Sequence, residues 1–206
     1  MKPYFPVALD LVGHTAVVVG GNHEAVDKAR KLAGARAAVR VVWPRVDADL
    51  QEMARRGVVE WRRRPPEAED FRGARLVVLA EPDADLAREL HSLGRSEGFW
   101  LCAIDQPEHC DWVNVGQVEA GPVRIGIASG GGAPGLVKRL RIDLSNALGG
   151  RFAAFANRLV AFREGLAGLP PEERRRRLTL ALEGFRLEIR ICYPDWESDP
   201  HSDPPG

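Results

Sequence analysis

Short apolar runs alternate with longer amphipathic stretches along the first half of the chain. β-Branched residues dominate the runs, whereas apolar residues in the stretches between them recur at helical spacing. This alternation is typical of βαβ units around a parallel sheet. Strands are expected over 16–19, 39–43, 58–61, 76–80 and 99–104, and helices from Gly21 to about Lys31, over 47–56 and over 84–97. The pattern predicts an α/β fold with a Rossmann-like, doubly wound parallel sheet.

The pattern changes after Asp105. Two further strands are expected over 113–118 and 123–128, and a glycine-rich loop over 129–134 opens a helix that reaches about Leu148. Beyond Gly149 and Gly150, an apolar stripe and then a proline pair predict two more helices, the second running from Pro170 to Arg190. The stripe consists of Phe152, Phe155, Leu159 and Phe162.

These elements suggest four parts of the chain. We predict a Rossmann-like domain over 1–112, a small α+β region over 113–150, a helical domain over 151–192 and a disordered tail over 193–206.

Charge and cysteine content narrow the class of protein. The 29 basic residues balance the 29 acidic ones, which argues against a nucleic-acid binder driven by bulk charge. Only four of the basic residues are lysines, and arginine suits planar recognition of carboxylates and phosphates; genomic codon bias is the other explanation. The three cysteines lack metal-site spacing, the N-terminus lacks the apolar core of a signal peptide, and charges interrupt every candidate membrane span. We expect a cytoplasmic protein without nucleic-acid or membrane partners.

A strand, a glycine turn and a helix follow one another at the N-terminus, as in the phosphate-binding element of a Rossmann unit. The G-x-G-x-x-G/A template falls on Gly20, Asn22 and Ala25, so asparagine replaces the middle glycine. Asparagine adopts positive φ more readily than most residues. Two interpretations stay open, dinucleotide binding and a tight turn in a flavodoxin-like sheet. No acidic residue ends the second strand to hold a ribose, and Arg45 at that place is compatible with a phosphate nearby.

Asp105 follows the fifth expected strand, at the sheet edge where open α/β folds bind ligands. A carboxylate there can act as a general base or bind a cationic or metal-bearing substrate, and it can equally begin a turn. His109, Cys110 and Asp111 offer further metal donors, but without a repeated ligand spacing, so we predict no resident metal site.

The loop from Ser129 resembles a second anion-binding site, because glycine-rich backbone precedes a helix N-terminus. A flexible hinge is the alternative. Lys138, Arg139 and Arg141 on the following helix favour an anion, although they cannot all face one ligand. The arginines at 174–177 are interpreted as a solvated face.

The order of these motifs resembles the precorrin-2 dehydrogenase and sirohydrochlorin ferrochelatase family, which also forms the N-terminal half of siroheme synthases. The resemblance covers about Tyr4 to Arg190. It is carried by Val-Val-Gly-Gly at 18–21, by Ala25, Lys28, Ala29 and Arg30, by Ile-Asp-Gln-Pro at 104–107, and by the loop at 129–134 with the basic helix at 138–141.

This resemblance implies oxidation of precorrin-2 to sirohydrochlorin with NAD⁺ and, in some members, insertion of Fe²⁺; Co²⁺ is the other candidate substrate metal. It implies a homodimer formed through the region 113–150, with Asp105 as the catalytic residue. NAD contacts are expected at Gly20, Gly21, Asn22, His23, Glu24, Pro44 and Arg45. Substrate contacts are expected at Ser129, Gly130, Gly131, Lys138 and Arg141.

Some residues depart from the family pattern. They are Asn22, Glu24, the segment Ala-Glu-Pro-Asp at 80–83, Ala87 and Cys102, and all lie in or beside the expected cofactor cleft. Two alternatives to a dehydrogenase therefore remain. One is a metal chelatase without the redox step, and the other is a non-catalytic tetrapyrrole-binding or regulatory protein.

Overall fold

A five-stranded parallel sheet forms the core of the N-terminal part. The computed structural model describes residues 4–194. The sheet has the order β3-β2-β1-β4-β5, and every neighbouring pair is parallel. Its strands are β1 (Thr15–Val19), β2 (Ala38–Val42), β3 (Val59–Arg62), β4 (Ala74–Leu79) and β5 (Trp100–Ala103). The predicted Rossmann-like sheet is confirmed.

Helices connect the strands of this sheet. They are α1 (His23–Gly34), α2 (Ala48–Arg55) and α3 (Ala84–Glu97), with the short 3₁₀ turns η1 (Ala68–Phe71) and η2 (Pro107–His109). Asparagine or aspartate caps the N-terminus of each of these three α-helices: the side chains of Asn22, Asp47 and Asp83 accept hydrogen bonds from N–H groups of the first turn.

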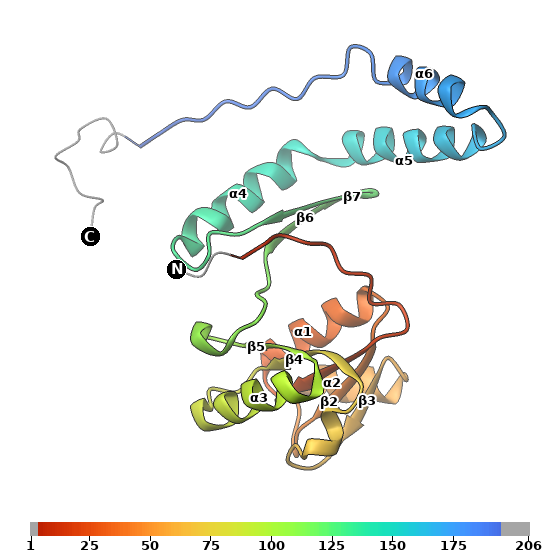
Figure 1. Ribbon diagram of the computed structural model, residues 1–206. Helices are drawn as coiled ribbons and strands as arrows, with labels where there is room; N and C mark the ends of the chain where they lie inside the picture. The colour runs from red at the N-terminus through yellow and green to blue at the C-terminus, as the bar shows by residue number, and fades with distance from the viewer. Residues whose placement is uncertain (1–3, 195–206) are drawn as a thin grey trace. The chain divides into compact units, whose positions relative to one another are not determined.

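Alternate residues of the central strands face opposite helical layers. Ala16 and Val18 of β1 belong to one buried cluster, together with residues of α1 and α2. Val17 and Val19 belong to a second cluster, together with residues of α3. Figure 1 shows α1 and α3 on opposite sides of the sheet. Burial on both faces explains why these strands are continuous apolar runs rather than alternating ones.

The strand order changes direction between β1 and β4. β1 pairs with β2 on one side and with β4 on the other, so the connections after β1 and β4 leave toward opposite ends of the sheet. A crevice at such a switch point is where open α/β sheets bind ligands. The segments that follow β1, β4 and β5 therefore define the region in which a functional site is expected.

The chain forms two compact units. One combines the described residues up to Val118 with Ile125–Asp143, and the other combines Glu119–Arg124 with the described residues from Leu144 onward. The remaining elements are the two-stranded sheet of β6 (Gly116–Ala120) and β7 (Val123–Ile127), followed by α4 (Pro134–Ala147), α5 (Gly150–Gly165) and α6 (Pro171–Ala181). Among the described residues, no helix is both long and apolar enough to cross a membrane.

Within the second unit, α6 folds back along α5 (Figure 1). The Phe155 ring of α5 stacks on Phe185 with centroids 5.3 Å apart, and Phe152 lies 6.2 Å from the same ring. The expected apolar stripe therefore packs against the segment after α6.

The last helix is shorter than expected. It ends at Ala181 instead of Arg190, so the prediction was wrong for its final part. Gly184 has φ +78°, a left-handed conformation that interrupts helical backbone. The domain boundaries at 112, 150 and 192 stay predictions, and most of the tail expected over 193–206 lies outside the described residues.

A buried carboxylate joins η1 to β3. Asp70 is fully buried and accepts hydrogen bonds from Arg62 Nη1 at 2.6 Å, Arg64 Nη1 at 2.8 Å and the Glu67 N–H at 2.8 Å. Burial opposes the charge of the Asp70 carboxyl, but these donors outweigh it and hold its pKa below the ordinary value. Asp70 therefore remains charged in the folded chain.

We expect Asp70→Asn to lower the free energy of unfolding by about 2–3 kcal/mol at neutral pH, because hydrogen bonds to a buried charge are lost. Since the pKa is lowered by folding, this contribution is present above the ordinary aspartate pKa and disappears as the pH falls through the folded value. Urea unfolding at several pH values measures both effects. Glu69→Gln, which removes an exposed partner of Arg64, is the control and is expected to change stability by less than about 1 kcal/mol.

Candidate functional site

The turn after β1 is closely packed against the segment after β2. Gly20 has φ +135°, which side chains rarely tolerate. A Cβ on Gly21 would lie 2.0 Å from the Arg45 carbonyl oxygen and 3.0 Å from Trp43 Cδ1. The Gly21 carbonyl in turn accepts the Asp47 N–H at 2.7 Å. Both positions therefore require glycine.

Asn22 stabilises this turn through its side chain. Its amide Nδ2 donates to the Ala80 carbonyl at 2.6 Å, and its Oδ1 accepts the Ala25 N–H at 3.0 Å. Its backbone is extended, with φ −85°, so the positive φ that asparagine can tolerate does not occur here. Extended backbone is the usual conformation of a residue that caps a helix N-terminus, and this requirement determines the conformation here.

The N-terminus of α1 offers backbone donors. In the described part of the chain, the N–H groups of His23 and Glu24 make no hydrogen bond. The Glu24 carboxylate forms an ion pair with Lys28 at 3.1 Å. Free N–H groups at a helix N-terminus, next to a closely packed glycine turn, suit the pyrophosphate of a dinucleotide.

Glu81, which is not among the site residues predicted from the sequence, contacts this turn from the segment after β4. Glu81 Oε1 accepts the Gly21 N–H at 2.9 Å and would lie 3.0 Å from a Cβ on Gly20. A carboxylate therefore occupies one donor of the turn. Glu81 follows β4, which neighbours β1 across the switch point, and that position is the signal that could have identified it.

Asp105 lies at the same edge of the sheet, as the second residue after β5. It is exposed and has φ +60°, a left-handed conformation that aspartate adopts more readily than most residues. The Ile104 N–H bonds the Leu79 carbonyl at 2.9 Å, which ties the start of this turn to the end of β4. The neighbouring Gln106 amide has both polar atoms buried without a hydrogen-bond partner in the described chain. The expected position of Asp105 at the sheet edge is confirmed, whereas its catalytic role stays a prediction.

The polar residues after Asp105 have structural contacts. Asp111 Oδ2 accepts the Leu101 N–H at 2.9 Å, and its Oδ1 lies 3.5 Å from His91 Nε2. The Cys110 thiol donates to the Ala103 carbonyl at 3.1 Å. A hydrogen bond with this thiol, together with burial, raises the pKa of Cys102. No cluster of three or more metal-binding side chains occurs in the described residues.

The glycine-rich loop before α4 is held by its first residue. Ser129 Oγ accepts the Ala133 N–H at 3.1 Å, and Gly130 and Gly131 have φ of +61° and +87°. Lys138 and Arg141 are exposed and form no ion pair in the described chain, whereas Arg139 pairs with Asp143 at 2.8 Å. The loop thus has the backbone conformation and the nearby charges expected of an anion-binding site. The serine hydroxyl oxygen already accepts a hydrogen bond from the loop itself.

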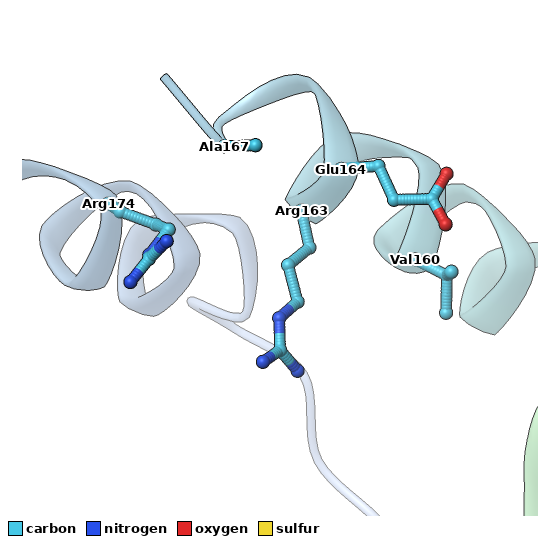
Figure 2. Close-up of a pocket in the computed structure, with 5 residues that line it drawn as sticks. All are labelled: Val160, Arg163, Glu164, Ala167 and Arg174. Atoms are coloured by element: carbon cyan, nitrogen blue, oxygen red, sulfur yellow. The ribbon is translucent and has the colours of Figure 1, made fainter. Parts of the chain in front are cut away.

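Two shallow cavities of about 400 and 320 Å³ lie along α5 and α6 in the second unit. Figure 2 shows Arg163 and Arg174 beside the smaller side chains of Val160 and Ala167. Arg163 and Arg174 form no ion pair in the described chain, whereas the neighbouring arginines 176 and 177 both pair with Glu173. The residues that line these cavities all belong to the second unit.

The chain is similar to proteins of known families. A family model described as "Putative NAD(P)-binding" matches residues 7–115. The siroheme synthase of Methylococcus capsulatus is 31% identical over 190 residues, which are 91% of this chain and 40% of that protein. The siroheme synthase of Pseudomonas entomophila is 33% identical over 174 residues, or 84% and 38%. The chain thus spans about two fifths of the length of these relatives.

One solved structure shares the fold. The precorrin-2 dehydrogenase SirC superposes with a TM-score of 0.73 at 21% identity, covering 88% of this chain and 90% of that one. At this identity the likeness concerns the fold. The structural similarity covers 88% of the chain and so extends well beyond residues 7–115, which the family model matches.

Proposed function

Because the chain belongs to this NAD(P)-binding family, we propose that it is a dehydrogenase that oxidises precorrin-2 to sirohydrochlorin with NAD⁺. One observation carries the proposal: two features lie at the same edge of the sheet. They are the dinucleotide-type glycine turn after β1 and the exposed carboxylate of Asp105 after β5. The names of the siroheme synthases and of SirC support the choice of substrate.

The residues at the switch point fit a dinucleotide. Gly20 and Gly21 leave no Cβ at the turn, and Asn22 caps α1 while the N–H groups of His23 and Glu24 remain available for the pyrophosphate. Pro44 and Arg45, after β2, lie next to this turn on the side where the adenosine half binds in Rossmann folds. When bound, the oxidised nicotinamide supplies a hydride acceptor.

Asp105 is the proposed general base. Oxidation of precorrin-2 removes one hydride and one proton, and the exposed carboxylate takes the proton as the hydride leaves. The proton then passes to solvent, because Asp105 is accessible to water. No other aspartate or glutamate directly follows β5, so this carboxylate is the natural candidate.

The substrate carries many carboxylates, and the first unit offers donors for them. We assign this role to the loop residues Ser129, Gly130 and Gly131 and to the cations Lys138 and Arg141 of α4. The exposed, unpaired state of the two cations supports the assignment. The same contacts would hold the ring in place while Asp105 acts.

The reaction itself tests this proposal. Purified protein given precorrin-2 and NAD⁺ is expected to form NADH and sirohydrochlorin in equal amounts, followed by the absorbance of each. Protein without precorrin-2 is the blank. Bound tetrapyrrole without any NADH formation would overturn the dehydrogenase and leave a chelatase or a non-catalytic binding protein.

We further propose a homodimer. Leu136, Leu140 and Ile142 of α4 are 58%, 41% and 42% exposed, which leaves apolar surface on the helix that follows the glycine-rich loop. Leu136 and Leu140 are four residues apart and share one face. The occupant proposed for this face is a second copy of the chain.

We expect the purified chain to sediment as a dimer, and Leu136→Glu with Leu140→Glu to shift it to monomer, because charges then line the contact face. Analytical ultracentrifugation over a concentration series measures the shift. Leu180→Glu, on α6 with a comparable 53% exposure, is the matched control and should leave the dimer intact. A monomeric parent chain at all concentrations would contradict the proposal.

A further inference from the structure

The end of β2 carries arginine where an NAD site usually carries a carboxylate. In Rossmann folds an aspartate or glutamate at this place binds the 2′-hydroxyl of the adenosine ribose, whereas an arginine accommodates the 2′-phosphate of NADP. Here β2 ends at Val42 and continues as Trp43, Pro44 and Arg45. The site therefore lacks the carboxylate that would repel a 2′-phosphate.

Contacts connect the glycine turn to this arginine. The Arg45 carbonyl and the Trp43 ring both lie against Gly21, so the segment after β2 borders the turn directly. Trp61 at the end of β3 donates its indole N–H to the Trp43 carbonyl at 2.9 Å. The Arg63 guanidinium lies 4.1 Å above the centre of the Trp61 ring. Successive contacts thus link the glycine turn to Trp43, Trp61 and Arg63, and Arg45 and Arg63 are the exposed arginines of this surface.

The acidic groups near this surface already have partners. Asp47 caps α2 by accepting the Asp49 N–H at 2.9 Å, and the Asp49 carboxylate pairs with Arg30 at 3.1 Å. Glu60 on β3 pairs with Arg40 and Arg62. The Arg45 side chain, by contrast, is exposed and forms no ion pair or hydrogen bond in the described chain. Its charge is available to a ligand.

We propose that this site accepts NADP⁺ as well as NAD⁺, with Arg45 binding the 2′-phosphate of the adenosine ribose. Arg63, stacked on Trp61, adds positive charge farther along the same surface. Guanidinium and phosphate form charge-assisted, paired hydrogen bonds, which an exposed hydroxyl does not match. The inference rests on the dinucleotide site of the proposed function and extends it to a second cofactor.

Adenosine 2′,5′-bisphosphate and adenosine 5′-monophosphate test the inference, because they differ only in the 2′-phosphate. Calorimetric titration of the full chain should show the bisphosphate binding about tenfold more tightly, the size of one good charge-assisted contact. Arg45→Gln should abolish most of this difference, so that the two nucleotides bind with nearly equal affinity. Arg45→Lys should keep part of it, because the charge remains.

Arg55→Gln is the control variant. Arg55 lies on α2 and pairs with Glu52, so its loss should leave the preference for the bisphosphate unchanged. NADP⁺ and NAD⁺ titrated in the same way should repeat the pattern, and thermal unfolding checks that each variant is folded.

The outcomes separate this inference from the proposed reaction. Binding of the monophosphate and NAD⁺ with no gain from the 2′-phosphate, or a gain that survives in Arg45→Gln, overturns the inference alone. A gain that depends on Arg45, in a chain that does not oxidise precorrin-2, supports the inference and overturns the reaction. Failure of every nucleotide to bind overturns both the cofactor site and the inference.

Discussion

Replacing Asp105 by asparagine should lower the rate of precorrin-2 oxidation by about 10²–10⁴-fold, the usual contribution of a general base. Asparagine has nearly the same size, but its amide cannot accept the proton. It also tolerates the left-handed backbone that Asp105 adopts at φ +60°, so the turn should persist. Binding of NAD⁺ should change less than about twofold, because the change affects a proton transfer and not the glycine turn. Single-turnover rates and a separate NAD⁺ titration measure the two effects.

Glu108→Gln is the matched control for this variant. Glu108 lies three residues farther along the same loop, in η2, and its replacement should keep the rate within about twofold. Asp105→Ala is less informative, since alanine is strained at positive φ and would combine a backbone effect with the chemical one. A rate near that of the parent chain in Asp105→Asn would show that another group takes the proton.

Gly21→Ala should have the second large effect, on binding of the cofactor. The added Cβ would lie 2.0 Å from the Arg45 carbonyl oxygen, and this neighbour is backbone that cannot rotate away. The turn must move, and with it the donors at the start of α1, so we expect NAD⁺ affinity to fall by at least about 100-fold. A loss of several kcal/mol in unfolding free energy should accompany it, as for other strained substitutions. Calorimetry and urea unfolding measure the two quantities.

Gly34→Ala provides the comparison, because a Cβ at the end of α1 would meet no atom within 4 Å. This variant should bind NAD⁺ as the parent chain does and unfold at the same or slightly higher urea concentration, since alanine favours helix over glycine. Undisturbed NAD⁺ binding in Gly21→Ala would mean that the dinucleotide does not bind at this turn.

Much of the sheet could be predicted because its strands are buried on both faces. Each expected strand of the parallel sheet overlaps the observed one, with ends that differ by two residues at most. Local patterns were less reliable where a single residue changes the backbone. The end of α6 is the example. The charged and apolar pattern of 171–190 does not show where the helix stops, whereas Gly184, with its left-handed backbone, lies just beyond that end.

Some residues of the candidate site could likewise be predicted from the sequence, and others could not. The glycine turn and Asp105 could be placed from the sequence because each directly follows a strand, and parallel strands end at a common edge. Glu81 also follows a strand at this edge, but its contact with the Gly21 N–H was not predicted, because the contact joins residues 60 positions apart. The second contact of Asn22, from its amide Nδ2 to the Ala80 carbonyl, could not be predicted either, because it joins residues 58 positions apart.

The run of valines in β1 has a consequence for how the sheet is aligned. A slip of one residue would exchange Val17 for Val18 and Val18 for Val19, so each helical layer would still meet a valine. Hydrophobic burial therefore discriminates poorly between neighbouring alignments of this strand. Discrimination must come from its ends, where the pairing with β4 shifts at Thr15 and where Gly20 and Gly21 admit no side chain. The glycines proposed to bind a cofactor therefore also help to fix the correct alignment of the central strand during folding.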